Sequence, residues 1–446
     1  MHGVSVEVTQ RPQKPQKLLP LRALRARLAT SLTRGAAALS RVAGRDGAVI
    51  GGRLGLLIDP DLLGNLAAGR AVALVSGTNG KTTTTRLTAA ALASLGKVAS
   101  NGLGANMPTG HTSALAAAGH TPYAVLEVDE HYLPGVLAET RPAVVALLNL
   151  SRDQLDRAKE VGLLAAAWRD ALAAWCAGPA GHGTRVVANA DDPLIAWAAS
   201  AVDPASGPST GTSPLPGPVI WVAAGQRWHD DSWVCPACGA AIARSGGSWS
   251  CTGCALRRPV PHWTVRDGGV VDPAGVHHVV HLGLPGRVNL ANAVTALAVA
   301  ACFGVPVPDA VPRLAEVTSV AGRYATVVRA GHTIRLLLAK NPAGWLEAFE
   351  MAADASTLLS LNARGPDGLD TSWLYDVDFT PLRGRHVLVT GDRALDLAVR
   401  LEVDGVAFTF ARSFAHAVAA APPGRLEVIA NYTAFQDIRA ELDRVN

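Results

Sequence analysis

A short apolar run, a glycine-rich loop and an Ala-rich helical segment follow one another at residues 71–96. The run AVALVS (71–76) has the composition of a buried β-strand, and the loop GTNGKTT (77–83) leads through Thr84 and Thr85 into RLTAAALASLG. Glycines let backbone N–H groups turn toward a phosphate, and the start of a helix adds partial positive charge. This order of strand, loop and helix predicts an α/β protein that binds a nucleotide phosphate.

Two side chains of this loop have expected roles. Lys81 is expected to reach the β- and γ-phosphates, and the Thr82 hydroxyl is expected to hold Mg²⁺. The strict phosphate-loop pattern has a glycine where this chain has Val75, so GTNGKTT is a compact variant. The phosphate-binding residues predicted here are Gly77, Thr78, Asn79, Gly80, Lys81, Thr82 and Thr83.

A cluster of acidic residues follows the next apolar run, YAVLEVD (123–129). Ligands of parallel sheets bind beyond the carboxyl ends of the strands, where this cluster and the glycine-rich loop should meet. A carboxylate or imidazole there would hold a metal ion that bridges phosphate oxygens. Glu127 is the favoured magnesium ligand, and Asp129, Glu130 and His131 are its neighbours in the cluster.

Four of the six cysteines form two CxxC pairs separated by 12 residues. Cys235 and Cys238 make up the first pair, and Cys251 and Cys254 the second. Four thiolates at this spacing predict a tetrahedral Zn²⁺ site with no open position for water, so the metal would be structural. The segment at about 228–262 is therefore predicted to be a zinc ribbon.

Residues 1–45 form a basic leader in which arginines alternate with Leu and Ala at the spacing of an amphipathic helix. We expect a solvated helix whose Leu face packs on the body of the protein, with contact to an anionic membrane surface as the alternative. The N-terminus lacks the apolar core of a signal peptide, and no run has the length of a transmembrane helix. A cytoplasmic location is the expectation.

Two larger domains are expected after the leader. Residues 46–320 would form the ATP-binding domain with the inserted zinc ribbon. Residues 321–446 would form a second, smaller α/β domain. Strands are predicted in the smaller domain at 334–339, 386–391 and 426–431. The formal net charge of the whole chain is only +4, which does not favour nucleic acid as a partner.

Several motifs resemble those of one ligase superfamily, in the same order along the chain. GTNGKTTTTRL resembles the ATP loop of the Mur ligases and folylpolyglutamate synthases. NLSRDQLDR (149–157) resembles a Mur motif, with Gln154 where that motif has His. NADDP (189–193) resembles a segment of the Mur central domain. The resemblance implies a Mur-ligase-like central domain and a Rossmann-like C-terminal α/β domain.

The same resemblance implies further contacts to ATP. The asparagines of NLANA resemble a pair that holds the adenine, and Gly322-Arg323 resembles an ATP-contacting pair at the domain boundary. Lys340-Asn341-Pro342 resembles the HNP element of the C-terminal domain, with Lys where His would be. The residues carried over as ATP contacts are Asn289, Asn292, Arg323, Lys340 and Asn341.

Three features narrow the resemblance to the MurT family, the ligase subunits of lipid II isoglutaminyl synthase. They are the four-cysteine insertion, the phrase RDQLDR and the run LAKNPAGW…LNARGPDGLDTSWLYDVDF. The resemblance implies that ATP phosphorylates the α-carboxylate of D-Glu in the stem peptide of lipid II. Ammonia then attacks the acyl phosphate and gives D-isoglutamine, at the inner face of the cytoplasmic membrane.

The ammonia needs a source. Cys176 and Cys302 lie in Ala-rich helical sequence and are predicted to be buried, so this chain lacks a glutaminase nucleophile and a second chain should supply ammonia. The family partner is GatD, a class-I-type glutamine amidotransferase, and the resemblance implies that a ligase Asp completes its catalytic group. The candidates are Asp370, ranked first, Asp367, and the less favoured Asp376 and Asp378.

Two other functions are considered. One is a stand-alone Mur-type or folylpolyglutamate-type ligase that joins an amino acid to a carboxylate without a partner. The other is a binding module with a regulatory phosphate loop and a nucleic-acid-binding zinc ribbon. The four-cysteine insertion and the Lys340-Asn341-Pro342 variant favour the MurT family over the first, and the small net charge argues against the second.

Overall fold

The structure of the chain is a computed structural model. Among the residues that it describes, no helix combines the length and the apolar character that a membrane span requires. The described residues are 20–42, 47–101, 104–152, 161–179, 181, 183–202, 217–225, 228–320, 323–352 and 355–444.

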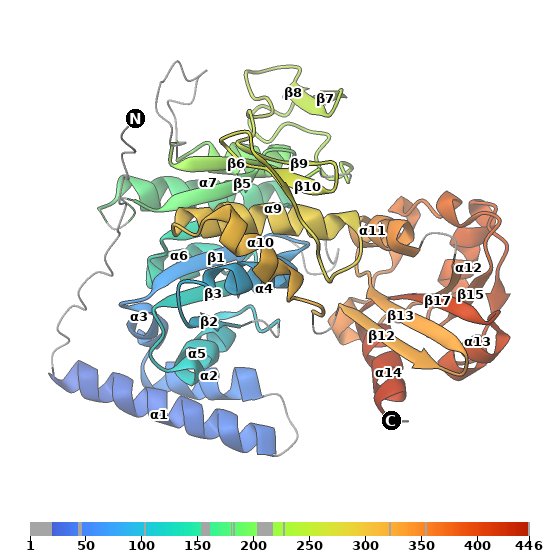
Figure 1. Cartoon of the computed structure of the whole chain (residues 1–446), viewed down its shortest axis with the longest axis horizontal. Coiled ribbons are helices and arrows are strands. Elements are labelled where there is room, and N and C mark those ends of the chain that lie inside the picture. Colours follow the sequence, from blue (N-terminus) through green and yellow to red (C-terminus); the bar gives the residue numbers. More distant parts are fainter. Residues whose placement is uncertain are drawn as a thin grey trace.

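A nine-stranded sheet lies at the centre of the larger half of the molecule (Figure 1), in the order β11-β10-β9-β6-β5-β4-β1-β3-β2. Neighbouring strands from β2 to β9 run parallel, as predicted, but β10 and β11 add an antiparallel edge. The β9–β10 turn has positive φ at Asp267 and Gly268, which suits a two-residue hairpin. The strands are β1 (Ala71–Ser76), β2 (Val98–Ser100), β3 (Tyr123–Val128), β4 (Val144–Leu147), β5 (Arg185–Asn189), β6 (Val219–Ala223), β9 (Trp263–Arg266), β10 (Gly269–Val271) and β11 (His277–Val279).

Helices cover both faces of this sheet, because its central strands are apolar on both sides. One face packs against α4 (Lys81–Leu92), α9 (Arg287–Cys302) and α10 (Val307–Ala315). The other face packs against α3 (Leu62–Ala67), α5 (Pro108–Ala118), α6 (Leu133–Thr140), α7 (Val161–Ala177) and α8 (Pro193–Ala199).

The four-cysteine segment lies between β6 and β9 and contains a separate hairpin, β7 (Ile242–Ser245) and β8 (Ser248–Cys251). The buried Trp249 indole Nε1 donates a hydrogen bond to the Ala190 carbonyl at 3.0 Å. Cys235 and Cys251 belong to the same hydrophobic cluster as the helices α7 and α8. The hairpin is thus anchored on the core of the larger half.

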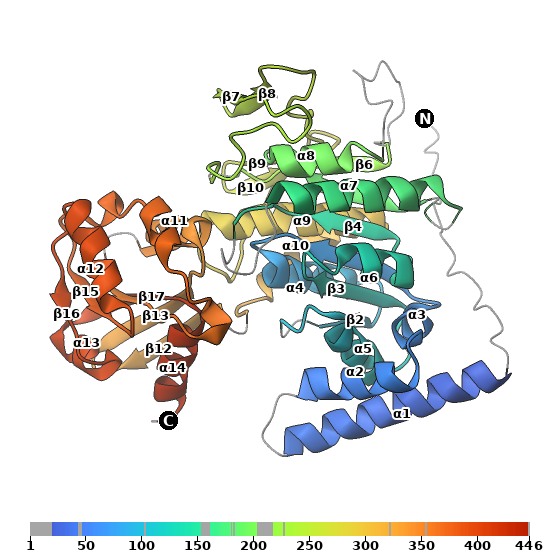
Figure 2. The same ribbon diagram turned by 180° about the vertical axis from the view of Figure 1, so that it is seen from behind.

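The smaller half is built on a six-stranded sheet in the order β12-β13-β17-β14-β15-β16 (Figure 2). All neighbouring pairs are parallel except β12 with β13. The three strands predicted from the sequence are β13, β15 and β17. The elements are β12 (Tyr324–Arg329), β13 (His332–Leu338), α11 (Pro342–Ala352), β14 (Ser356–Ser360), η1 (Gly365–Asp367), η2 (Ser372–Asp376), η3 (Thr380–Leu382), β15 (Val387–Thr390), α12 (Ala394–Val403), β16 (Thr409–Phe410), α13 (Phe414–Ala420), β17 (Gly424–Ala430) and α14 (Tyr432–Asp443).

Two N-terminal helices, α1 (Pro20–Val42) and α2 (Gly47–Ile58), lie along the edge of the larger half (Figure 1). The expectation that the leucines of the leader pack on the body is wrong, because Leu21, Leu28 and Leu39 are exposed. Small residues of α1 face α2 instead, since glycines of α2 let the two helix axes approach closely.

Candidate active site

The glycine-rich loop joins β1 to α4 in a conformation that its glycines make possible. Gly80 has φ +83°, and a Cβ at this position would lie 2.4 Å from Oδ1 of Asn292 on α9. A Cβ on Gly77 would lie 2.8 Å from Cβ of Leu148. Side chains larger than hydrogen therefore do not fit at either position, and α4 begins directly after the loop, at Lys81.

The loop is held by the segment that follows β4. The Asn79 backbone N–H donates to Oδ1 of Asn149 at 2.9 Å, and Nδ2 of Asn149 donates to the Asn79 carbonyl at 3.1 Å. The Ser151 backbone N–H donates to Oγ1 of Thr78 at 3.0 Å. These bonds fix the loop against the motif that begins at Asn149. Residues 153–157 of that motif, Gln154 included, lie outside the described residues.

Lys81 forms a buried ion pair at the start of α4. Its Nζ lies 3.1 Å from both carboxylate oxygens of Glu130 and donates to the Thr78 carbonyl at 3.3 Å. Both side chains of the ion pair are less than a tenth exposed. The sequence named Glu130 only as a neighbour of Glu127, yet Glu130 is the carboxylate that holds the phosphate-loop lysine.

Glu127 lies at the carboxyl end of β3 and is buried. Its backbone is fixed, because Asn101 Nδ2 and His111 Nε2 both contact its carbonyl oxygen, at 2.8 and 2.7 Å. Among the described residues, its carboxylate Oε2 has no hydrogen-bond partner. An unpartnered carboxylate oxygen is costly inside a protein, and a cation would satisfy it. Burial lowers the pKa of the adjacent His111 to about 4, so this imidazole is neutral at pH 7.

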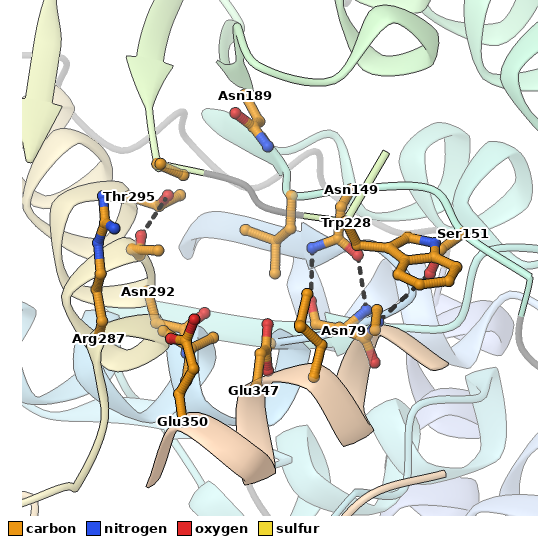
Figure 3. A pocket seen from close by; sticks show the side chains of 18 residues that line it. Asn79, Asn149, Ser151, Asn189, Trp228, Arg287, Asn292, Thr295, Glu347 and Glu350 are labelled. Carbon is orange, nitrogen blue, oxygen red and sulfur yellow. Dashed lines mark hydrogen bonds between the residues drawn. The ribbon is translucent and has the colours of Figure 1, made fainter. Parts of the chain in front are cut away.

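A cleft opens between the glycine-rich loop, α9 and α11 (Figure 3). It contains about 940 Å³ of atom-free space, with the open solvent at its mouth included. Asn79, Asn149, Asn292 and Glu347 face it from three directions, and Arg287 and Glu350 lie along one side. Both halves of the chain therefore line one cleft.

The predicted ATP contacts occupy different positions around this cleft. Asn292 lines it directly, and its Nδ2 donates to Oδ1 of the buried Asn289 at 3.1 Å, so Asn289 supports Asn292 from behind. Nδ2 of Asn341 donates to Oδ1 of Asn79 at 3.3 Å and joins the smaller half to the glycine-rich loop. Arg323 and Lys340 line an adjoining hollow that also contains Asn79; Gly322 lies outside the described residues.

Other residues of the cleft carry no signal in the sequence. Glu347 of α11 lines both the cleft and the adjoining hollow. Burial raises the pKa of Glu347 to about 7, although the nearby Arg323 guanidinium opposes the shift. Trp228 comes from the start of the four-cysteine segment, and Arg287 from the start of α9. A lone Glu or Trp has no motif around it, so only the fold reveals these side chains.

Arg152 connects three parts of the chain beside the cleft. Its Nη1 lies 3.1 Å from Oδ2 of Asp376 in η2, and its guanidinium also pairs with Asp231 of the four-cysteine segment. The same Asp231 carboxylate accepts a hydrogen bond from the Trp228 indole. Asp376, one of the four aspartates named for a partner, thus contacts the larger half of its own chain.

The segment 189–193 is mostly structural. Asp192 caps α8 by accepting from the Leu194 backbone N–H at 2.8 Å, and burial raises its pKa to about 6. Asp191 pairs with Arg258 at 2.7 Å. Asn189 alone of this segment lines the cleft.

The four sulfur atoms of Cys235, Cys238, Cys251 and Cys254 lie within 4.8 Å of one another. Cys235 and Cys254 are 3.7 Å apart, and Cys238 and Cys251 are 3.4 Å apart. Zinc bound tetrahedrally by thiolates at about 2.3 Å would place its sulfur ligands about 3.8 Å apart. The cluster therefore has the dimensions of a closed four-thiolate site.

The aspartates of the smaller half have distinct surroundings. Asp367 caps α14, because its carboxylate accepts from the backbone N–H of Thr433 at 2.9 Å and from the Thr433 hydroxyl. Asp378 accepts from the Thr380 backbone N–H at 2.9 Å. Asp370 is exposed. It accepts a hydrogen bond from the Ser372 backbone N–H at 2.8 Å, and this bond lowers the pKa of Asp370. Asp370 and Asp378 are thus both exposed carboxylates that accept from a residue two positions ahead, whereas Asp367 and Asp376 contact other elements.

Comparisons with known proteins agree with this fold and cleft. Residues 75–206 match the Mur ligase middle domain. The fold resembles a pseudomurein peptide ligase type C from Methanothermus fervidus, with a TM-score of 0.62 and 17% identity over 84% of this chain and 79% of that chain. It also resembles Mycobacterium tuberculosis folylpolyglutamate synthase complexed with ADP. The TM-score is 0.54, and the identity is 16% over 94% of this chain and 98% of that chain. The fold and the matched middle domain thus define a Mur-ligase-type protein.

Closer relatives narrow this class to one family. Residues 338–435 match the MurT ligase C-terminal family. The MurT subunit of lipid II isoglutaminyl synthase (glutamine-hydrolyzing) from Streptococcus pneumoniae (strain ATCC BAA-255 / R6) is 30% identical over 386 residues, which cover 80% of this chain and 83% of the relative. The chain belongs to the MurT family of ligase subunits.

Proposed function

We propose that this chain is the ligase subunit of a glutamine-dependent lipid II isoglutaminyl synthase in peptidoglycan biosynthesis. It would use ATP to amidate the α-carboxylate of D-Glu in the stem peptide of lipid II. The observation that carries the proposal is the site itself. It combines a buried phosphate-loop lysine with a buried carboxylate that has one unpartnered oxygen among the described residues, beside a cleft lined by both halves of a MurT-family chain.

The cleft suits ATP. The glycine-rich loop offers backbone N–H groups at the start of α4, and Lys81 supplies a positive charge for the β- and γ-phosphates. Thr82 and the unpartnered Oε2 of Glu127 are the groups that would hold Mg²⁺, which would offset the negative charge of the phosphates. Asn292, Arg323, Lys340 and Asn341 are proposed as the further contacts to the nucleotide, with Asn289 behind Asn292. A related fold has been crystallised with ADP.

The chemistry follows from the poor reactivity of a carboxylate. Transfer of the γ-phosphoryl group to the D-Glu α-carboxylate would form an acyl phosphate and release ADP. Ammonia would then attack the carbonyl carbon, lose a proton, and expel inorganic phosphate, so that an amide replaces the carboxylate. Lys81 would stabilise the charge that develops on the transferred group.

The smaller half offers a surface for the glutaminase partner. Exposed apolar side chains of α12, at Leu395, Val399 and Val403, repeat every four residues. The exposed Leu369 and Tyr375 flank Asp370 on the segment that contacts this helix through η2. We propose that a GatD-type subunit covers this face and that Asp370 completes its catalytic group. Asp367 is less suited to that role, because it caps α14.

Zn²⁺ is the proposed occupant of the cysteine cluster, where it would hold the segment around β7 and β8 together. Because lipid II carries a long isoprenoid chain, we propose that the reaction takes place at the inner face of the cytoplasmic membrane. No role for nucleic acid is proposed.

The proposal is tested by incubating the purified chain with lipid II, Mg-ATP and ammonium chloride, followed by mass spectrometry of the stem peptide. We expect the small mass loss that accompanies replacement of OH by NH₂. An unchanged stem peptide, together with ATP hydrolysis that responds to added amino acids, would instead support a stand-alone ligase.

A further inference from the structure

The outer face of α1 is an apolar stripe. At about 100° per residue, Leu21, Leu24, Leu28, Leu32 and Leu39 fall within a sector of about 80° of the helix. All five side chains are exposed, from 40% for Leu32 to 81% for Leu21. A surface helix of a globular protein normally turns such a stripe toward the core. We therefore expect the stripe to be covered by a binding partner outside the described residues.

The packing of α1 explains why its leucines face outward. The buried residues of α1 are small, at Ala29, Thr33, Ala37 and Ser40, and they contact α2. A Cβ on Gly55 of α2 would lie 2.1 Å from Oγ1 of Thr33. The two helices meet through small residues at close range, which leaves their large apolar side chains on the outside.

The second helix extends the apolar surface. Ile50, Leu54 and Leu57 of α2 lie on one side of that helix and are exposed, and Val49 precedes them. On its other side α2 packs tightly on α5, where a Cβ on Gly52 would clash with the Thr109 carbonyl. Figures 1 and 2 show α1 as the outermost element at this edge, with α2 between it and α5.

The charge around this surface is predominantly positive. Residues 1–58 contain ten Lys or Arg and only two acidic residues, although the whole chain has a formal net charge of just +4. The helix α1 contains no Asp or Glu. Arg22, Arg27 and Arg53 are exposed beside the leucines. Apolar side chains flanked by arginines fit the boundary between the headgroups and the acyl chains of an anionic bilayer.

We infer that α1 and α2 form a membrane-docking surface for anionic phospholipid. The leucines would enter the headgroup–acyl boundary, and the arginines would lie at the level of the lipid phosphates. The inference deepens the proposed function, on which its biological purpose rests, because docking would hold the ligase at the surface where a lipid-linked substrate resides.

The test is co-sedimentation of the full-length chain with vesicles, without ATP or substrate, so that its outcome does not depend on ligase activity. Vesicles of phosphatidylcholine and phosphatidylglycerol in equal parts are compared with vesicles of phosphatidylcholine alone. We expect binding to the anionic vesicles at least tenfold tighter than to the neutral ones, and weaker in high salt. Equal binding to both, or no binding to either, would overturn the inference.

Matched variants locate the surface. The triple change Leu24→Gln, Leu28→Gln and Leu32→Gln should reduce vesicle binding at least tenfold, and Arg22→Gln with Arg27→Gln should reduce it severalfold. The control triple Leu395→Gln, Val399→Gln and Val403→Gln changes an exposed apolar stripe on α12 and should have no effect. If the control triple weakens binding as much, the docking surface is wrongly assigned.

A second copy of the chain is the rival occupant. Analytical ultracentrifugation of the wild type and the α1 triple variant distinguishes self-association from membrane docking. A dimer that dissociates on the leucine changes, with no vesicle binding, would overturn membrane docking. With ammonium as nitrogen donor, the α1 triple should amidate a lipid-free stem-peptide acceptor as the wild type does, so an inactive ligase and a lost docking surface remain distinguishable.

Discussion

At the residue scale, the central feature is the ion pair between Lys81 and Glu130 at the start of α4. We predict that Lys81→Ala lowers the amidation rate at least 100-fold with any ammonia source, because the charge on the transferred phosphoryl group loses its counterion. The control is Lys97→Ala, an exposed lysine after the same helix, which should keep full activity. Stem-peptide mass spectrometry over time measures both rates, and an active Lys81→Ala enzyme would remove this residue from the mechanism.

A pH dependence of stability is expected from Glu347. Its pKa is about 7 in the folded chain and 4.5 in the reference state, so the native chain holds a proton that the unfolded chain releases between these values. The stability contributed by this proton is present below pH 4.5 and is lost as the pH rises through 7. Glu347→Gln cannot ionise and avoids the loss.

The measurement is thermal unfolding of the wild type and Glu347→Gln between pH 5 and pH 8. The melting temperature of the variant relative to the wild type should rise by about 2 °C or more across this range, which corresponds to about 1 kcal/mol. Glu402→Gln, at an exposed site on α12, should show no such trend. A difference that is independent of pH would mean that Glu347 is ionised throughout.

Individual residues were predictable where a motif surrounds them. Asn79, Gly80 and Asn292 line one cleft, and Asn341 donates to Asn79 of the same loop. The roles of these residues as nucleotide contacts stay predictions. Glu130 as the partner of Lys81 was not predictable, because four polar side chains follow one another after β3 and the turn decides which of them points back. Glu347 was not predictable either, since the fold alone places this residue of α11 in a buried position beside the cleft and near Arg323.

At the element scale, the four-cysteine segment joins the core of the larger half to the cleft. We predict one Zn²⁺ per chain, and we predict that Cys235→Ser abolishes zinc binding and lowers the melting temperature by several degrees. Trp228 lines the cleft and Asp231 holds Arg152, so the variant should also weaken ATP binding. Zinc content, thermal unfolding and nucleotide binding are the measurements, with Cys176→Ser as the control.

Full stability and full zinc content in Cys235→Ser would contradict the assignment of the cluster. An unchanged ATP affinity in a zinc-free protein would contradict only the link to the cleft. The contact between the four-cysteine segment and the cleft was not visible in the sequence. The spacing of the cysteines predicts a zinc ribbon but no contribution to the nucleotide site.

The predictable elements are those with strong local patterns. Apolar runs predicted β1, β3 and all three strands named in the smaller half, because buried parallel strands have continuous apolar sequences. The antiparallel β10 and β11 edge and the outward leucines of α1 were not predicted. Both depend on tertiary packing, which a one-dimensional pattern does not contain.

At the scale of the whole molecule, the two parts of the proposed reaction would take place on different surfaces. ATP and the carboxylate would meet in the cleft, and the glutaminase would dock beside Asp370. We predict that Leu395→Gln with Val399→Gln weakens binding of a GatD-type subunit at least tenfold, because two exposed apolar anchors are lost. Isothermal titration measures this, and the α1 triple variant is the control that should bind normally.

The measurement that tests the central claim most directly compares nitrogen donors in the wild type and Asp370→Asn. Each chain is mixed with a GatD-type subunit, lipid II and Mg-ATP, and stem-peptide amidation is followed with glutamine or with ammonium chloride. We predict that Asp370→Asn loses glutamine-driven amidation and keeps ammonium-driven amidation at the wild-type rate. An equal loss with both donors would place Asp370 in the ligase site, and full activity with glutamine would contradict its role in the partner's catalytic group.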